Sequence, residues 1–92
     1  MIVRIATEGQ YELTDDHAEE LNRLDNAAVD AVEAGNETTF REVFDQMIEL
    51  VRRDGTPVDG DDLSSSDVII PPPDTSLEEA REEFSGEGLI PG

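Results

Sequence analysis

The chain has 92 residues, of which 24 are Asp or Glu and only 6 are basic, so its formal net charge is −18. This charge excludes the clustered basic surface that binds phosphates, and we therefore expect no direct contact with nucleic acid. The absence of Cys excludes disulfides and thiol chemistry, and a chain of this length predicts one small domain over residues 1–92.

Residues 1–13 are predicted to form a β-hairpin. Apolar side chains alternate with other residues from Val3 to Ile5 and again from Tyr11 to Leu13, which is the period of half-buried strands. The turn falls at residues 7–9, where Gly9 tolerates a positive φ.

Residues 15–54 are predicted to form an antiparallel helical hairpin that holds most of the core. The first helix is capped by a residue among positions 14–16 and ends at Gly35, and the second starts at Asn36 or Thr38 and ends at Gly55. The second helix has the clearest apolar periodicity in the chain, carried by Phe40, Val43, Phe44, Met47, Ile48 and Val51.

Residues 56–92 are predicted to contain a solvated loop, an extended Pro-rich segment, a short helix and a tail. The loop runs from Pro57 through the serines at 64–66, and the helix runs from Leu77 to about residue 84 behind a capping box of Ser76 and Glu79. A third short strand is predicted at 68–70, at the edge of the hairpin, where three prolines end it. The predicted fold class is therefore α+β.

Two apolar segments in this last region are the candidate partner-binding residues. They could dock on a partner by strand addition or as an extended ligand, or they could fold back over the sheet and helices as a lid. The sequence leaves both alternatives open. The candidate residues are Val68, Ile69, Ile70, Pro71, Pro72 and Pro73, together with Leu89, Ile90 and Pro91.

The sequence predicts no catalytic residue, no metal site and no cofactor. His17 is the single histidine, and with the flexible carboxylates of Asp15, Asp16 and Glu20 it lacks the ligand set of a zinc site. The acidic loop that begins at Asp59 fails the calcium-loop pattern, because Gly60 is its second residue and not its sixth, and Ile70 stands at the twelfth position, where Glu is required. The paired carboxylates elsewhere are typical of hydrated helix faces.

Seven short motifs are spread along the whole chain in a characteristic order and spacing. They are Met1-Ile2-Val3-Arg4-Ile5, Glu8-Gly9-Gln10-Tyr11, Leu21-Asn22-Arg23-Leu24-Asp25, Val32-Glu33-Ala34-Gly35, Asp54-Gly55-Thr56-Pro57, Asp67-Val68-Ile69-Ile70-Pro71-Pro72-Pro73-Asp74 and Gly88-Leu89-Ile90-Pro91-Gly92. In this order and spacing they resemble the PspA-associated domain family of archaea and actinobacteria. The resemblance implies a non-enzymatic partner of PspA, a membrane-stress protein with an ESCRT-III-like coiled-coil fold at the inner face of the membrane. It also implies that no catalytic residues are carried over.

The charge also predicts where the protein works. Repulsion among the acids destabilises a compact state in dilute salt and is largely screened at about 1 M salt, which favours a salt-saturated cytosol, as in a haloarchaeon. The N-terminus does not match a signal peptide and no apolar run reaches the length of a membrane span, so any membrane role is expected to go through a partner. The alternative function is an acidic DNA mimic, such as an antitoxin-like or transcriptional accessory protein.

Overall fold

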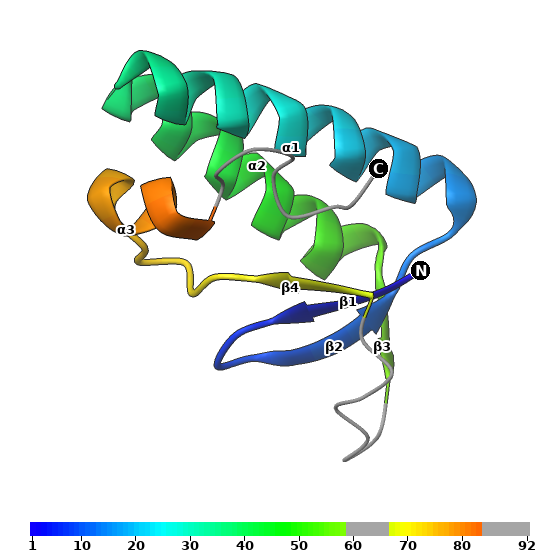
Figure 1. Cartoon of the computed structure of the whole chain (residues 1–92). Helices are drawn as coiled ribbons and strands as arrows, with labels where there is room; N and C mark the ends of the chain where they lie inside the picture. Colours follow the sequence, from blue (N-terminus) through cyan, green and yellow to red (C-terminus); the bar gives the residue numbers. More distant parts are fainter. Residues whose placement is uncertain (59–66, 84–92) are drawn as a thin grey trace.

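A helical layer covers one face of a four-stranded sheet in the computed structural model, which describes residues 1–58 and 67–83 (Figure 1). In chain order the elements are β1 (Ile2–Ile5), β2 (Gly9–Glu12), α1 (Asp15–Ala34), α2 (Glu37–Asp54), β3 (Thr56–Val58), β4 (Val68–Ile70) and α3 (Leu77–Glu83). The predicted α+β class is confirmed, with its N-terminal hairpin, helical hairpin and short C-terminal helix.

The strand order is β3-β2-β1-β4, and it places β4 at one edge of the sheet. β1 pairs with β2 antiparallel and with β4 parallel, so that Val3 lies opposite both Tyr11 and Val68. Residues opposite one another share a face of a sheet, and Val3, Ile5, Val68 and Ile70 are all buried. These residues form the sheet's side of the core.

Residues 56–58 correct the prediction of a loop after Gly55. They form β3, which pairs antiparallel with β2 and places Pro57 opposite Tyr11. Proline lacks the N–H that a central strand needs, but an edge strand tolerates it because only one side is paired. The presence of proline in a three-residue strand concealed this element in the sequence.

The predicted apolar face of α2 supplies the largest buried side chains on the helical side of the core. The rings of Phe40 and Phe44 stack with their centroids 5.3 Å apart, and Met47, Ile48 and Val51 are buried beside them. This arrangement confirms that the helical period marks the core.

The ends of the helices follow the predicted capping signals. The Thr14 side chain accepts from the His17 backbone N–H, and that of Asn36 accepts from the Thr39 N–H at 3.1 Å. Gly35 adopts φ 69°, and the N–H of Asn36 reaches the Ala31 carbonyl oxygen at 2.9 Å, as in a Schellman motif. The helical hairpin is therefore closed by short-range contacts that the sequence encodes.

Candidate functional site

The predicted partner-binding segment divides into a buried part and an exposed part. Val68 and Ile70 are only 2% and 0% exposed, whereas Ile69 between them is 58% exposed. Pro71 is buried, and Pro72 and Pro73 are partly exposed. Leu89, Ile90 and Pro91 lie outside the described residues. The segment is thus a strand of the sheet that presents one large apolar side chain, and its binding role stays a prediction.

Asp67 fixes the start of β4 against β1. Its backbone N–H donates to the Ile2 carbonyl oxygen at 2.8 Å, and its carboxylate oxygen Oδ2 accepts from the Ile2 N–H, also at 2.8 Å. Two hydrogen bonds between the same two residues set where β4 begins. In the sequence, Asp67 stands out only as an acid before an apolar run, and that pattern did not predict its hydrogen bonds with Ile2.

Arg41 of α2 fixes the segment that follows β4. Its guanidinium donates to the carbonyl oxygens of Pro73 at 2.8 Å and Thr75 at 3.1 Å. The same group lies 5.3 Å from the centroid of the Phe44 ring and 3.3 Å from a carboxylate oxygen of Asp45. The planar fork of Arg suits simultaneous donation and stacking. The Asp45 contact is an i,i+4 pair within α2, whereas the contacts with Pro73 and Thr75 join distant residues and were not predicted from the sequence.

The predicted capping box starts α3 directly after this segment. The backbone N–H of Ser76 donates to Glu79 at 3.0 Å, and the Glu79 N–H donates to the Ser76 hydroxyl at 3.2 Å. These hydrogen bonds lower the pKa of the Glu79 carboxyl, the one from the Ser76 backbone being the largest cause. Upstream, the Thr75 hydroxyl donates to the Pro72 carbonyl oxygen at 2.7 Å. The chain from Asp67 to Glu79 is therefore held at both ends.

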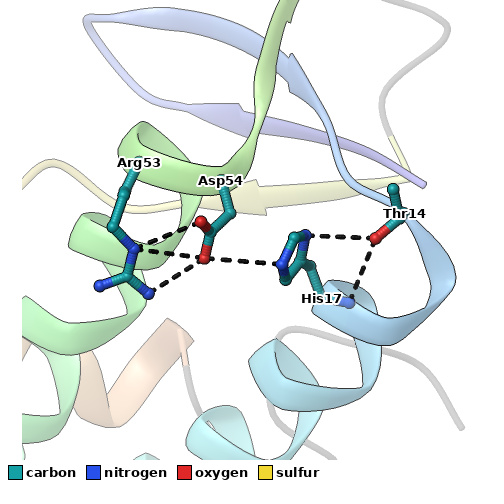
Figure 2. Close-up of polar contacts among 4 residues, drawn as sticks. All are labelled: Thr14, His17, Arg53 and Asp54. Carbon is teal, nitrogen blue, oxygen red and sulfur yellow. Dashed lines mark hydrogen bonds and ion pairs between the residues drawn. The ribbon is translucent and has the colours of Figure 1, made fainter.

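His17 takes part in a polar cluster that joins the start of α1 to the end of α2 (Figure 2). His17 Nδ1 lies 3.2 Å from Thr14 Oγ1, and His17 Nε2 lies 3.8 Å from Asp54 Oδ2. Arg53 donates to the same Asp54 carboxylate at 3.0 Å, and this hydrogen bond is the main cause that lowers the pKa of Asp54. The sequence pointed instead to Asp15, Asp16 and Glu20 as neighbours of His17, because only residues near in sequence could be considered.

Nothing in this cluster indicates metal chemistry. In residues 1–58 and 67–83 there is no group of three or more His, Cys, Asp or Glu side chains placed to hold a metal ion. The contacts of His17 connect helix ends, and we interpret the cluster as structural.

A second ion pair connects α2 to the turn between β1 and β2. Arg52 donates to both carboxylate oxygens of Glu8, with Nε 2.9 Å from Oε1. The hydrogen bond from Arg52 is the main cause that lowers the pKa of Glu8. The turn that it holds has positive φ at Thr7 (74°) as well as at Gly9 (140°). Arg52, in the last turn of α2, therefore supports the hairpin turn of the sheet.

Asp25 is a buried acid for which the sequence predicted no role. It lies on the apolar side of α1, four residues after Leu21 and four before Val29, and it is fully buried. The signal was present, because a carboxylate interrupts the apolar period at this position. A buried carboxyl group is costly unless it has interaction partners, and Asp25 is not without a partner in this fold.

Two surface hollows show no arrangement of catalytic groups. One, of about 410 Å³, is lined by Met1, Asp15, Ala18, Glu19 and Asn22. The other, of about 160 Å³, lies between α1 and α2 and is lined by Glu20, Leu24, Gln46, Glu49, Leu50 and Arg53. Neither lining includes a Ser, Cys or His that could act as a nucleophile with a nearby base.

The fold and its contacts define a small, acidic, two-layer α+β domain whose distinctive feature is an apolar edge strand held at both ends. The chain belongs to the family described as PspA-Associated protein, because the PspAA family model matches residues 1–92. Comparison with curated proteins and with solved structures found no match. Among the helices that the structure describes, none is both long enough and apolar enough to cross a membrane.

Proposed function

We propose that this protein is a non-enzymatic adaptor that binds a PspA-like, ESCRT-III-like membrane-stress protein and modulates its assembly. The observation that carries the proposal is the match of the PspA-associated family model to residues 1–92, which include every strand and helix that the structure describes. We also propose that binding takes place in the cytosol, and that the coiled-coil partner recruits this protein to the inner face of the cell membrane.

The proposed mechanism is differential binding. A ligand shifts an equilibrium only by the difference between its affinities for the two states. The adaptor therefore changes the assembly of its partner if it binds the free subunit and the assembled form unequally. The described site supports this role, since it offers an edge strand that hydrogen bonds hold at both ends.

The negative charge of the protein favours a partner with a basic surface. A net charge of −18 attracts a partner surface that carries basic residues, and this steering weakens as salt rises. At molar salt the contact therefore depends chiefly on apolar burial and short-range hydrogen bonds.

The test is reconstitution with the purified PspA-like protein encoded in the same genome, in molar KCl. Sedimentation velocity measures whether the two proteins travel together, and negative-stain microscopy measures the length and number of partner assemblies with and without this protein. We expect a saturable complex and a changed assembly distribution. An unrelated acidic protein of similar size and charge is the control for nonspecific attraction.

Two results would contradict the proposal. If no complex is recovered even after mild crosslinking, association within the family does not mean binding here. If the protein instead competes with DNA for a nucleic-acid-binding protein recovered from the native cytosol, the DNA-mimic alternative is favoured.

A further inference from the structure

We propose that the outer edge of β4 accepts an extended, apolar segment of the partner as a fifth strand of the sheet. This inference rests on the proposed function and specifies which surface of the adaptor makes the contact. In the part of the chain that the structure describes, β4 pairs only with β1, and it ends the strand order. Its other edge is therefore available for main-chain pairing.

The two edges of the sheet differ in how they are protected. β3 carries Pro57 in the middle of its three residues, and proline prevents a further strand from pairing fully. β4 has the sequence Val-Ile-Ile, with neither proline nor charge. Such an edge is one that proteins normally shield, because it readily pairs with another chain. The contrast within one sheet assigns the binding role to β4.

Ile69 gives this edge an apolar anchor. It is 58% exposed, and among residues 1–58 and 67–83 it is the only large hydrophobic side chain on the exposed surface. It lies opposite Arg4, on the face of the sheet away from the buried Val68 and Ile70. In strand addition, main-chain hydrogen bonds are accompanied by contacts of alternate side chains with the added segment. An exposed β-branched side chain on an edge strand can make such a contact.

The edge is also held in place before any partner arrives. Asp67 bonds twice to Ile2 on one side of β4, and Arg41 bonds to the carbonyl oxygens of Pro73 and Thr75 on the other. A binding surface that is already ordered loses less conformational entropy on association. A strand of only three residues can therefore serve as a template.

Charge complementarity identifies the occupant as a partner segment that has Lys or Arg at its ends. Exposed acids, Asp67 and Asp74, flank the strand and the prolines that follow it. A second copy of this chain would bring the same two acids and a further charge of −18 against them. A segment with β-branched residues in its centre would pair with β4, and basic residues at its ends would lie near Asp67 and Asp74.

The test compares two substitutions to lysine at opposite edges of the same sheet. Ile69→Lys adds a charge to the β4 edge, and Thr56→Lys makes the same change in charge at an exposed position of β3. The probe is the purified full-length PspA-like protein in molar KCl. We expect Ile69→Lys to weaken its binding at least about tenfold and Thr56→Lys less than about twofold. Ile69→Thr, which keeps the β-branch, should fall between them.

A backbone measurement separates strand addition from simple apolar contact. Hydrogen–deuterium exchange followed by mass spectrometry should show slower exchange in the peptide covering 67–73 when the partner is bound, with little change in the peptide covering β3. Circular dichroism and thermal melts of each variant establish whether it folds. If Ile69→Lys does not fold, Ile69→Thr replaces it as the test variant.

The outcomes distinguish the inference from the proposed function. If the wild-type protein does not bind the partner, both are wrong. If it binds and the Ile69 variants bind equally well, or if exchange at 67–73 is unchanged, the function stands and the β4 edge is wrong. A wild-type dimer in the absence of partner that is lost in Ile69→Lys would overturn the assignment of the occupant, because a second copy would then fill the edge.

Discussion

The Arg41 guanidinium of α2 donates a 2.8 Å hydrogen bond to the carbonyl oxygen of Pro73, a residue 32 positions further along the chain. This bond ties the helical layer to the segment that leaves the edge strand of the sheet. The same guanidinium lies against the Phe44 ring, so its position is fixed by the core on one side. The exposed strand β4 thus takes its rigidity from a residue in the helical hairpin.

We predict that Arg41→Lys destabilises the fold by about 1–2 kcal/mol, because a single ammonium group cannot stack on the ring and reach two carbonyl oxygens together. Urea unfolding at fixed molar salt measures the change. The control is Arg23→Lys, at an exposed i,i+3 pair with Glu20, where we expect less than about 0.5 kcal/mol. Equal effects at the two positions would show that the carbonyl contacts of Arg41 do not stabilise the protein.

Gly55 is predicted to be intolerant of a side chain because of close packing. Its φ of −78° is accessible to any residue, but a Cβ there would clash with the Val51 carbonyl oxygen and lie 2.8 Å from Tyr11 Cβ. We therefore expect Gly55→Ala to cost about 1–3 kcal/mol, as overpacked sites do.

The comparison for Gly55 is Gly35→Asn, at a position whose left-handed backbone asparagine tolerates. A Cβ at Gly35 would meet Arg81 at an ordinary contact distance of 3.6 Å, so the expected cost is below about 0.5 kcal/mol. Thermal melts of the two variants should separate by several degrees. If Gly55→Ala melts with the wild type, α2 and β2 are not packed as tightly as described.

The parts of this fold that the sequence predicted depend on residues near one another in the chain. Helix caps at Asn36 and Ser76, the glycine at 35 and the apolar period of α2 all act over one or two helical turns, and each is confirmed. The hairpin turn is also local, although the positive φ of Thr7 has no signal in its residue type.

The features that the sequence did not predict depend on distant partners. Arg41 reaches Pro73 and His17 reaches Asp54 across 32 and 37 positions, and no local pattern encodes which acid or carbonyl lies opposite. β3 is defined by its pairing with β2, since its own three residues carry no alternation. The candidate site was located because residues 68–73 stand out in composition. Which of its side chains are buried depends on the register of β4 with β1, which the sequence does not specify, and the structure buries Val68 and Ile70 on either side of the exposed Ile69.

The lowered pKa of Glu79 predicts a pH-dependent contribution to stability. A carboxyl whose folded pKa lies below its usual value stabilises the fold above that usual value, and the contribution is lost as pH falls through the folded pKa. Glu79→Gln keeps a hydrogen-bonding side chain in the capping box but removes the charge. The variant should therefore melt below the wild type near pH 7, and the difference should shrink below the usual carboxyl pKa and vanish only as pH falls through the lowered folded pKa of Glu79.

The Glu79 comparison is best made in molar KCl, where protonation of the many other acids changes long-range repulsion least. Asp30→Asn, on the exposed side of α1, is the matched loss of one carboxylate without a capping role. A difference between wild type and Glu79→Gln that persists unchanged to low pH would show that the charge of Glu79 does not act through the cap.

Stability is predicted to rise with salt from about 0.1 M to molar KCl, because screening shortens the reach of repulsion among acids that total 24 against 6 arginines. A melting curve in a KCl series measures the slope. Neutralising two exposed acids of α1, Asp30→Asn with Glu33→Gln, should raise the melting temperature at low salt and have little effect at molar salt. Arg23→Gln, which removes a positive charge from the same helix, should lower it at low salt. If all three proteins show the same flat dependence, repulsion among the acids does not limit the stability of this fold.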